Sequence, residues 1–315
     1  MAKKGMKYAI FSDIHGNIYG LQSALADAKA CNVDKFLFLG DYASNFPWGN
    51  EVADVLRNLE YASIIAGNGE GYLERLKNDA QQSALYEQFA LVNWTWNTLS
   101  PENANFLTDL PPTGIVNDAD TPIYLEHASS VFFRQSTPLS RIHAFHSRYY
   151  KNNLAGISQE EYLKHARDAL LAREDAMAEV AALPAGIHLF GHNHLQWHAH
   201  IADKLFLNPG SVGEPLMGDS RATYTILTVE GNKWHVDERR VEYDLEAALT
   251  SFDNSNFCTF SPGWARAMRL TLESGLDYPS VFLEHLRKTA AAENHEGFPV
   301  PNPVWESAVA SWAPT

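Results

Sequence analysis

Short apolar runs alternate with segments of helical periodicity over roughly the first 70 residues of the chain. Three of these runs, Tyr8–Phe11, Phe36–Leu39 and Ser63–Ala66, have the length and composition of buried strands. Between them, apolar residues recur at the spacing of amphipathic helices: Ile18, Leu21, Leu25 and Ala28, then Val52, Val55, Leu56 and Leu59. This β-α-β-α-β alternation predicts a sheet with helices on its faces.

The same pattern predicts further elements along the chain. Apolar runs at 123–126, 187–190 and 204–207 are expected to form or extend a second sheet. The runs Thr223–Val229 and Trp234–Val241 flank the turn sequence Glu230-Gly231-Asn232-Lys233 and predict a hairpin. Helical segments are expected at 81–98, 160–182, 264–272 and 279–286. The whole pattern is that of an α/β protein.

Polar side chains able to bind a metal follow five of the predicted strands. They are Asp13 and His15, Asp41, Asn68, His127, and the pair His192 and His194. In α/β proteins, residues at the carboxyl ends of different strands can converge on one site. Mixed imidazole and carboxylate ligands suit Zn, Fe, Mn or Ni rather than Ca. The seven residues together predict a dinuclear metal centre.

These residues lie in sequence blocks that resemble the five signature loops of the calcineurin-like metallophosphoesterases. The blocks are Ser12-Asp13-Ile14-His15-Gly16-Asn17, Leu39-Gly40-Asp41, Gly67-Asn68, Glu126-His127 and Phe190-Gly191-His192-Asn193-His194. A further block, Leu207 to Gly213, resembles the turn found in the small bacterial and archaeal phosphodiesterase branch. The matches run in family order over residues 6 to 230. The resemblance implies a four-layer α/β/β/α sandwich.

The resemblance also implies how the residues are shared between two divalent ions. One ion would be bound by Asp13, His15, Asp41 and His194, and the other by Asp41, Asn68, His127 and His192, so that Asp41 bridges both. The implied activity is hydrolysis of a phosphodiester or phosphoanhydride of a nucleotide-type substrate, by in-line attack of a metal-bound hydroxide. Asp41, Asn68 and His127 are the expected catalytic residues. The metal is left open among Mn, Fe, Zn and Ni.

Each residue taken singly also has a structural interpretation. Asp13 and Asp41 could cap helices, and Asn68 after a glycine could form a tight turn. His127 could be a hydrogen-bonded interior histidine. Asn17 is expected to be a helix cap or a loop-forming residue rather than a ligand, and the block from 208 to 213 a turn that supports the site. All of these interpretations would have to hold together to exclude the metal centre.

One position departs from the family pattern. Where the family has a histidine that assists the leaving group, this chain has Gly69, followed by Glu70. Glycine cannot donate a proton, so strong activity on alkyl monoesters is not expected. Either Glu70 or a histidine of the inserted segment could compensate. Alternatives to the phosphodiesterase are a phosphomonoesterase or protein phosphatase, and a non-catalytic scaffold such as the retromer subunit that shares this fold.

Composition limits the partners. The net charge of −14 argues against extended contact with nucleic acid, but not against a small phosphorylated substrate held by two divalent ions. Only Cys31 and Cys258 are present, which predicts no disulfide framework. No signal peptide or membrane-length apolar stretch is found, so a cytoplasmic location without membrane contact is expected. Oligomeric state is left open.

Two segments are additions to the family's minimal fold. We expect a metallophosphoesterase domain over 1–250 with an insertion at 128–186, and a helical extension over 251–315 packed on it. From 128 to 159 the insertion lacks Asp and Glu. It carries arginines that could grip a substrate phosphate: Arg134, Arg141 and Arg148. A solvated loop or a subunit contact is the alternative.

Overall fold

The protein is described by a computed structural model. It describes residues 5–78, 85–117, 121–129, 131–132, 161, 164, 168, 171–216, 218–231 and 233–314. The arginines Arg134, Arg141 and Arg148 of the expected substrate clamp lie outside these residues, as does most of the insertion.

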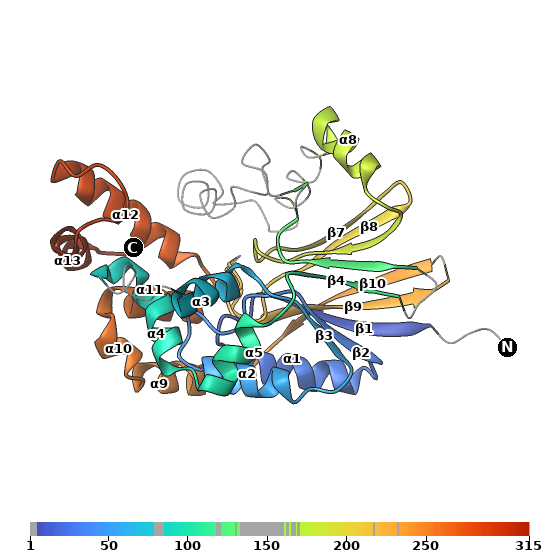
Figure 1. Cartoon of the computed structure of the whole chain (residues 1–315), viewed down its shortest axis with the longest axis horizontal. Coiled ribbons are helices and arrows are strands. Elements are labelled where there is room, and N and C mark those ends of the chain that lie inside the picture. Colours follow the sequence, from blue (N-terminus) through green and yellow to red (C-terminus); the bar gives the residue numbers. More distant parts are fainter. Residues whose placement is uncertain are drawn as a thin grey trace.

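The first sheet has the strand order β10-β9-β1-β2-β3 (Figure 1). Its strands are β1 (Met6–Phe11), β2 (Lys35–Phe38), β3 (Ala62–Ile64), β9 (Ala222–Glu230) and β10 (Lys233–Val241). The first three are parallel, with Ile10 beside Leu37 and Phe38 beside Ile64. β9 runs antiparallel to β1, and β9 and β10 form the predicted hairpin. The expected β-α-β-α-β unit is thus confirmed.

The second sheet has the order β4-β5-β6-β8-β7. Its strands are β4 (Thr113–Val116), β5 (Ile123–Glu126), β6 (Gly186–Leu189), β7 (Gln196–Ile201) and β8 (Lys204–Pro209). β5, β6 and β8 are parallel to one another, and these are the three strands predicted at 123–126, 187–190 and 204–207. β4 and β7 are antiparallel edge strands.

Helices cover the outer faces of the two sheets (Figure 1). The first sheet carries α1 (Ile18–Ala30) and α2 (Gly49–Arg57), and α3 (Asn68–Asn78), α4 (Ala90–Thr98) and α5 (Pro101–Thr108) lie beside them. α8 (Glu174–Ala182) packs on the second sheet. α1 begins where the Asn17 side chain accepts a hydrogen bond from Gly20 N, 3.0 Å away, so the expected cap at Asn17 is confirmed.

Strand alternation explains the layered core. In β1, Ala9 and Phe11 pack toward the helices, whereas Tyr8 and Ile10 pack between the sheets. The layer between the sheets is almost entirely branched aliphatic: it includes Leu37, Leu39, Ile123, Leu125, Ile187, Leu189, Leu205 and Leu207. A third apolar layer joins the second sheet to α8. The four-layer α/β/β/α order is therefore confirmed.

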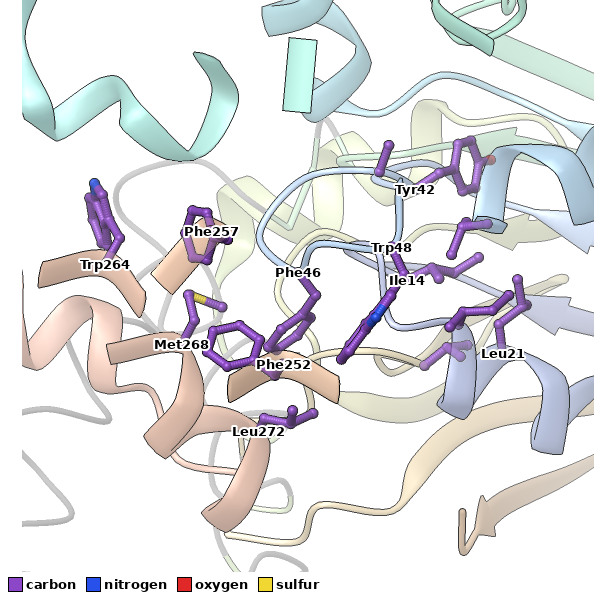
Figure 2. Packing of buried hydrophobic residues seen from close by; sticks show 14 of the residues in the cluster. Ile14, Leu21, Tyr42, Phe46, Trp48, Phe252, Phe257, Trp264, Met268 and Leu272 are labelled. Carbon is purple, nitrogen blue, oxygen red and sulfur yellow. The ribbon is translucent and has the colours of Figure 1, made fainter. Parts of the chain in front are cut away.

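The C-terminal helices extend the core on the helix side of the first sheet. They are α9 (Leu245–Asp253), α10 (Phe257–Phe260), α11 (Pro262–Ser274), α12 (Tyr278–Ala292) and α13 (Asn302–Ser311). Phe252 of α9 and Met268 of α11 belong to the same cluster as Phe46 and Trp48 of the loop after β2, with the Phe46 and Phe252 ring centroids 6.2 Å apart (Figure 2). No helix within the described residues is long and apolar enough to cross a bilayer.

Two predicted helices differ from those observed. The single helix expected over 160–182 is interrupted at Arg173, whose extended backbone (φ −93°, ψ 113°) precedes α8. The Arg173 guanidinium contacts the Asp175 carboxylate in the first turn of α8, where an acidic group also favours a new helix start. Of the helix expected over 81–98, residues 81–84 lie outside the described residues; Tyr86 is extended, and a 3-10 turn at Glu87–Phe89 then leads into α4 at Ala90. The expected C-terminal helices are confirmed, with longer bounds in α11 and α12.

Candidate metal centre

The strand ends bring all seven predicted residues to one place. Asp13 and His15 follow β1, Asp41 follows β2, and Asn68 begins α3 after β3. The second sheet contributes the remaining three from the ends of β5 and β6: His127, His192 and His194. Five of the residues are buried, whereas Asn68 is exposed and His192 is half-buried. The site is thus embedded on one side and open to solvent on the other.

One group of side chains gathers around His15. The Nε2 atoms of His15 and His194 lie 3.1 Å apart, and Asp13 Oδ1 lies 3.4 Å from His194 Nε2. The donor atoms of these three buried residues all lie within 4.8 Å of one another, so they could hold one metal ion. Asp13 Oδ1 is buried and accepts no hydrogen bond from any described residue. A buried carboxylate oxygen in that position fits a cation as its partner.

A second group gathers around His127. Its Nε2 lies 3.4 Å from Asp41 Oδ2 and 3.0 Å from Asn68 Oδ1. Asn68 Oδ1 also lies 2.8 Å from His192 Nδ1. Asp41 Oδ2 is 3.8 Å from His15 Nε2 as well, so this carboxylate lies between the two groups. Asp13, Asp41 and His127 form a compact group that could hold an ion.

The histidine tautomers favour a cation in both groups. His194 Nδ1 lies 2.6 Å from Glu214 O, and His127 Nδ1 lies 2.7 Å from Leu39 O. Only a protonated nitrogen can bond to a carbonyl oxygen, so in the neutral ring each Nε2 carries the lone pair and points it into the site. There the lone pairs would meet carboxylate and amide oxygens, which are acceptors too, so each Nε2 needs either a proton or a metal ion between itself and these oxygens. A hydrogen bond from Nδ1 to a carbonyl is also the usual way to orient a metal-binding histidine.

The backbone of these loops is strained. Five of the seven residues have left-handed backbone conformations, namely Asp13 (φ 53°), His15 (φ 51°), Asp41 (φ 59°), His192 (φ 73°) and His194 (φ 59°). Such conformations are uncommon for residues other than glycine and cluster at functional sites. Neither Asp13 nor Asp41 is a helix cap, since Asn17 and Trp48 hold those positions at α1 and α2.

Buried hydrogen bonds hold the strained loops in place. The Glu70 carboxylate accepts the backbone amides of Asp41, Tyr42 and Gly67, at 2.9, 2.9 and 2.8 Å. Both of its oxygens are therefore used to support the loop, and Glu70 does not replace the missing proton donor at position 69. The Asn208 amide donates to Gly191 O at 2.8 Å, as expected for a turn that supports the site.

Burial and mutual charge shift the pKa values of the site. Burial raises the pKa of Asp13 to about 7, with His127 opposing and Asp41 adding to the shift. Burial would lower the pKa of His127, but the Asp41 and Asp13 carboxylates raise it to about 10. Burial also acts to raise the pKa of Asp41, but His127 and His15 outweigh it and hold that pKa well below its usual range. Bound cations would take the place of the proton on His127.

Two residues beside the site lie outside the sequence motifs. Glu214 is 4% exposed, and its Oε2 lies 3.9 Å from His15 Nε2. The Asn45 side-chain amide donates to the same Glu214 oxygen at 2.6 Å. The position of Glu214 could have identified it from the sequence. It directly follows the Asn208–Gly213 turn, and so lies beyond the end of β8, another parallel strand. Asn45 gives no such signal, because it lies four residues beyond Asp41 in an irregular loop.

Comparison with known families assigns the chain that forms this site to one of them. The model of the calcineurin-like phosphoesterase superfamily domain matches residues 6–232. The chain belongs to this superfamily. The membership expected from the sequence blocks is therefore confirmed, and the chain is a metallophosphoesterase-family protein with an α/β sandwich and a helical C-terminal extension.

Individual relatives are distant. An uncharacterized protein of Methanocaldococcus jannaschii is 25% identical over 240 residues, covering 76% of this chain and 89% of that protein. A metallophosphoesterase of Sphaerobacter thermophilus has a similar structure, with a TM-score of 0.57 and 20% identity over 86% of this chain and 99% of its own. The structure of a hypothetical protein of Pyrococcus horikoshii is similar with a TM-score of 0.57 and 18% identity, covering 79% of this chain and 92% of that protein. At these identities the two structures show the fold alone.

Proposed function

We propose that the protein is a metal-dependent phosphoesterase that hydrolyses a phosphodiester or phosphoanhydride with a good leaving group, such as a nucleotide. The observation that carries the proposal is the convergence of two ligand groups on Asp41, whose Oδ2 lies 3.4 Å from His127 Nε2 and 3.8 Å from His15 Nε2. Asp13, His15, Asp41 and His194 would hold one divalent ion. Asp41, Asn68, His127 and His192 would hold the other.

Two divalent ions in such a site orient a phosphoryl group, offset its charge and lower the pKa of a water molecule. The side chains of this chain then have three tasks. Asp41 holds both ligand groups at a fixed separation, and Asn68 and His192 present the more exposed group to the substrate. His127 is kept in one tautomer by Leu39 O, so its Nε2 faces the ligand site.

The leaving group must depart without help from position 69. Gly69 has no side chain, and its backbone amide donates to Asp41 Oδ1 at 2.6 Å. Glu70 is occupied by three backbone amides. A general acid contributes about 10²- to 10⁴-fold, most of all for a basic leaving group. The proposed substrates are therefore those whose leaving oxygen is already a stable anion, as in aryl esters and phosphoanhydrides.

A series of substituted phenyl phosphodiesters tests this proposal. With Mn²⁺-loaded protein, kcat/KM should fall steeply as the pKa of the leaving phenol rises, and simple alkyl phosphates should be poor substrates. A flat series, with chemistry shown to be rate-limiting, would mean that another residue donates the proton. No hydrolysis of any member of the series, or of dinucleoside polyphosphates, would reject the enzyme assignment.

Restoring a histidine gives a sharper comparison. Gly69→His should flatten the dependence on the leaving group. A Cβ atom there would lie 3.0 Å from Asp41 Oδ1 and 3.3 Å from Ser44 Oγ, so a small local shift is needed. Gly69→Ala adds the Cβ atom without the imidazole and so measures how far that shift alone lowers activity. Gly71→His is the matched control two residues later, where a Cβ meets no atom within 4 Å.

A further inference from the structure

Glu214 brings a third carboxylate to a site whose motifs supply only two. Its Oε2 lies 3.9 Å from His15 Nε2. Asp13 Oδ1 and Asp41 Oδ2 lie at nearly the same distances from that nitrogen, 3.9 and 3.8 Å. Three acidic side chains therefore surround His15 at the first ligand group.

Hydrogen bonds fix Glu214 both at its side-chain carboxylate and at its backbone amide. Its carboxylate accepts the Asn45 amide at 2.6 Å, and its backbone amide donates to Ser211 Oγ at 2.8 Å. The same Ser211 hydroxyl donates to Asp13 O at 2.6 Å, which ties the segment to the first metal loop. The Glu214 side chain is only 5% exposed, so solvent screens its charge poorly.

Glu214 stands beside the ligands rather than among them. Within the described part of the chain, the compact groups that could hold an ion are Asp13, His15 and His194, and Asp13, Asp41 and His127. Glu214 belongs to neither. The Asn45 amide donates to its carboxylate and holds it at the wall of the site.

We propose that Glu214 sets the charge preference of the site, favouring monoanionic phosphodiesters over dianionic phosphomonoesters and free phosphate. The inference rests on the proposed function, because it assumes two divalent ions. These ions bring four positive charges, and Asp13, Asp41 and Glu214 bring three negative ones. The Glu70 carboxylate is left out of this count because its oxygens are bonded to three backbone amides behind the site. The site then carries a net charge of about +1, which one diester neutralises but which a dianion exceeds. Without Glu214 the net charge would match a dianion instead.

The test compares binding of two anions that differ by one charge. Metal-loaded protein is titrated calorimetrically at pH 8 with inorganic phosphate, mainly a dianion, and with dimethyl phosphate, a monoanion. Glu214→Gln keeps the shape of the side chain. It should tighten binding of inorganic phosphate about tenfold and of dimethyl phosphate only about threefold, because the removed repulsion scales with the ligand charge. Glu293→Gln, which removes an exposed carboxylate at the end of α12, should change neither.

Several outcomes would overturn the proposal. Equal effects on the two anions, or none on either, mean that Glu214 does not discriminate by charge. Loss of a metal equivalent from Glu214→Gln by elemental analysis would make Glu214 a ligand rather than a charge filter. Thermal melting of the metal-free variants checks that both fold. Because binding is measured without turnover, absence of hydrolysis by the unaltered protein would reject the proposed function and leave this result standing.

Discussion

Glu70 offers the sharpest test of how the strained metal loops are held. The carboxylate is 2% exposed and accepts three backbone amides, two at Oε2 (from Asp41 and Gly67) and one at Oε1 (from Tyr42). Glu70→Ala leaves all three N–H groups without this acceptor. Glu70→Gln keeps one oxygen, which can serve the Asp41 and Gly67 amides, but turns an NH₂ group toward the Tyr42 amide.

The expected losses of folding stability follow from the number of backbone amides that lose their acceptor in each variant. An unsatisfied buried donor costs about 1–3 kcal/mol, and water entering the space left by alanine recovers part of that. We expect Glu70→Ala to lose about 4 kcal/mol of folding stability, and Glu70→Gln about 2 kcal/mol. Both should also weaken metal binding, because Asp41 has a positive φ that the surrounding bonds must maintain.

Urea unfolding of the metal-free protein, followed by tryptophan fluorescence, measures the stability without the contribution of bound metal. Glu74→Ala is the matched control, since Glu74 is an exposed residue of the same helix α3, and it should change stability by less than about 0.5 kcal/mol. The reasoning is refuted if Glu70→Gln unfolds at the same urea concentration as the unaltered protein. It is also refuted if Glu70→Ala unfolds at the same urea concentration as the Glu74→Ala control.

Three further predictions concern the site. Asp41→Asn should reduce bound metal from two ions per chain to fewer than one and lower turnover by orders of magnitude; full occupancy by elemental analysis would contradict a bridging role. Because the pKa of His127 is raised to about 10, its proton stabilises the metal-free fold fully below about pH 6.5 and is lost as the pH rises through 10. Mn²⁺ must displace that proton, so its affinity should rise about tenfold per unit between pH 7 and 9, with proton release in calorimetry; a pH-independent affinity would count against this. Gly191→Ala places a Cβ 1.8 Å from Ser12 Oγ and should cost about 1–3 kcal/mol in unfolding experiments, whereas Gly71→Ala, in open space, serves as the tolerant control.

The sequence by itself determined most of the strands and the place of the site, whereas the four-layer order was implied by the resemblance of its motif blocks to a family. Alternation within Tyr8–Phe11 assigns each side chain of β1 to one of two apolar layers, since the strand period is two residues. The ligand-type residues could be found because each directly follows a strand, where chain direction and sheet order place them at one edge. Local signals also located the Asn17 cap and the β9–β10 hairpin.

Only the tertiary structure decided what surrounds the ligands. Glu70 was a conceivable proton donor in the sequence, but its oxygens accept two amides of the distant loop after β2, those of Asp41 and Tyr42, and the nearby amide of Gly67. Glu214 and Asn45 are 169 positions apart and meet only because the loops after β2 and β8 close on the same histidine. The helical periodicity over 160–182 also did not predict the break at Arg173. Periodicity and strand ends are local properties of the chain, whereas the partner of a buried polar group depends on which segments the fold brings together.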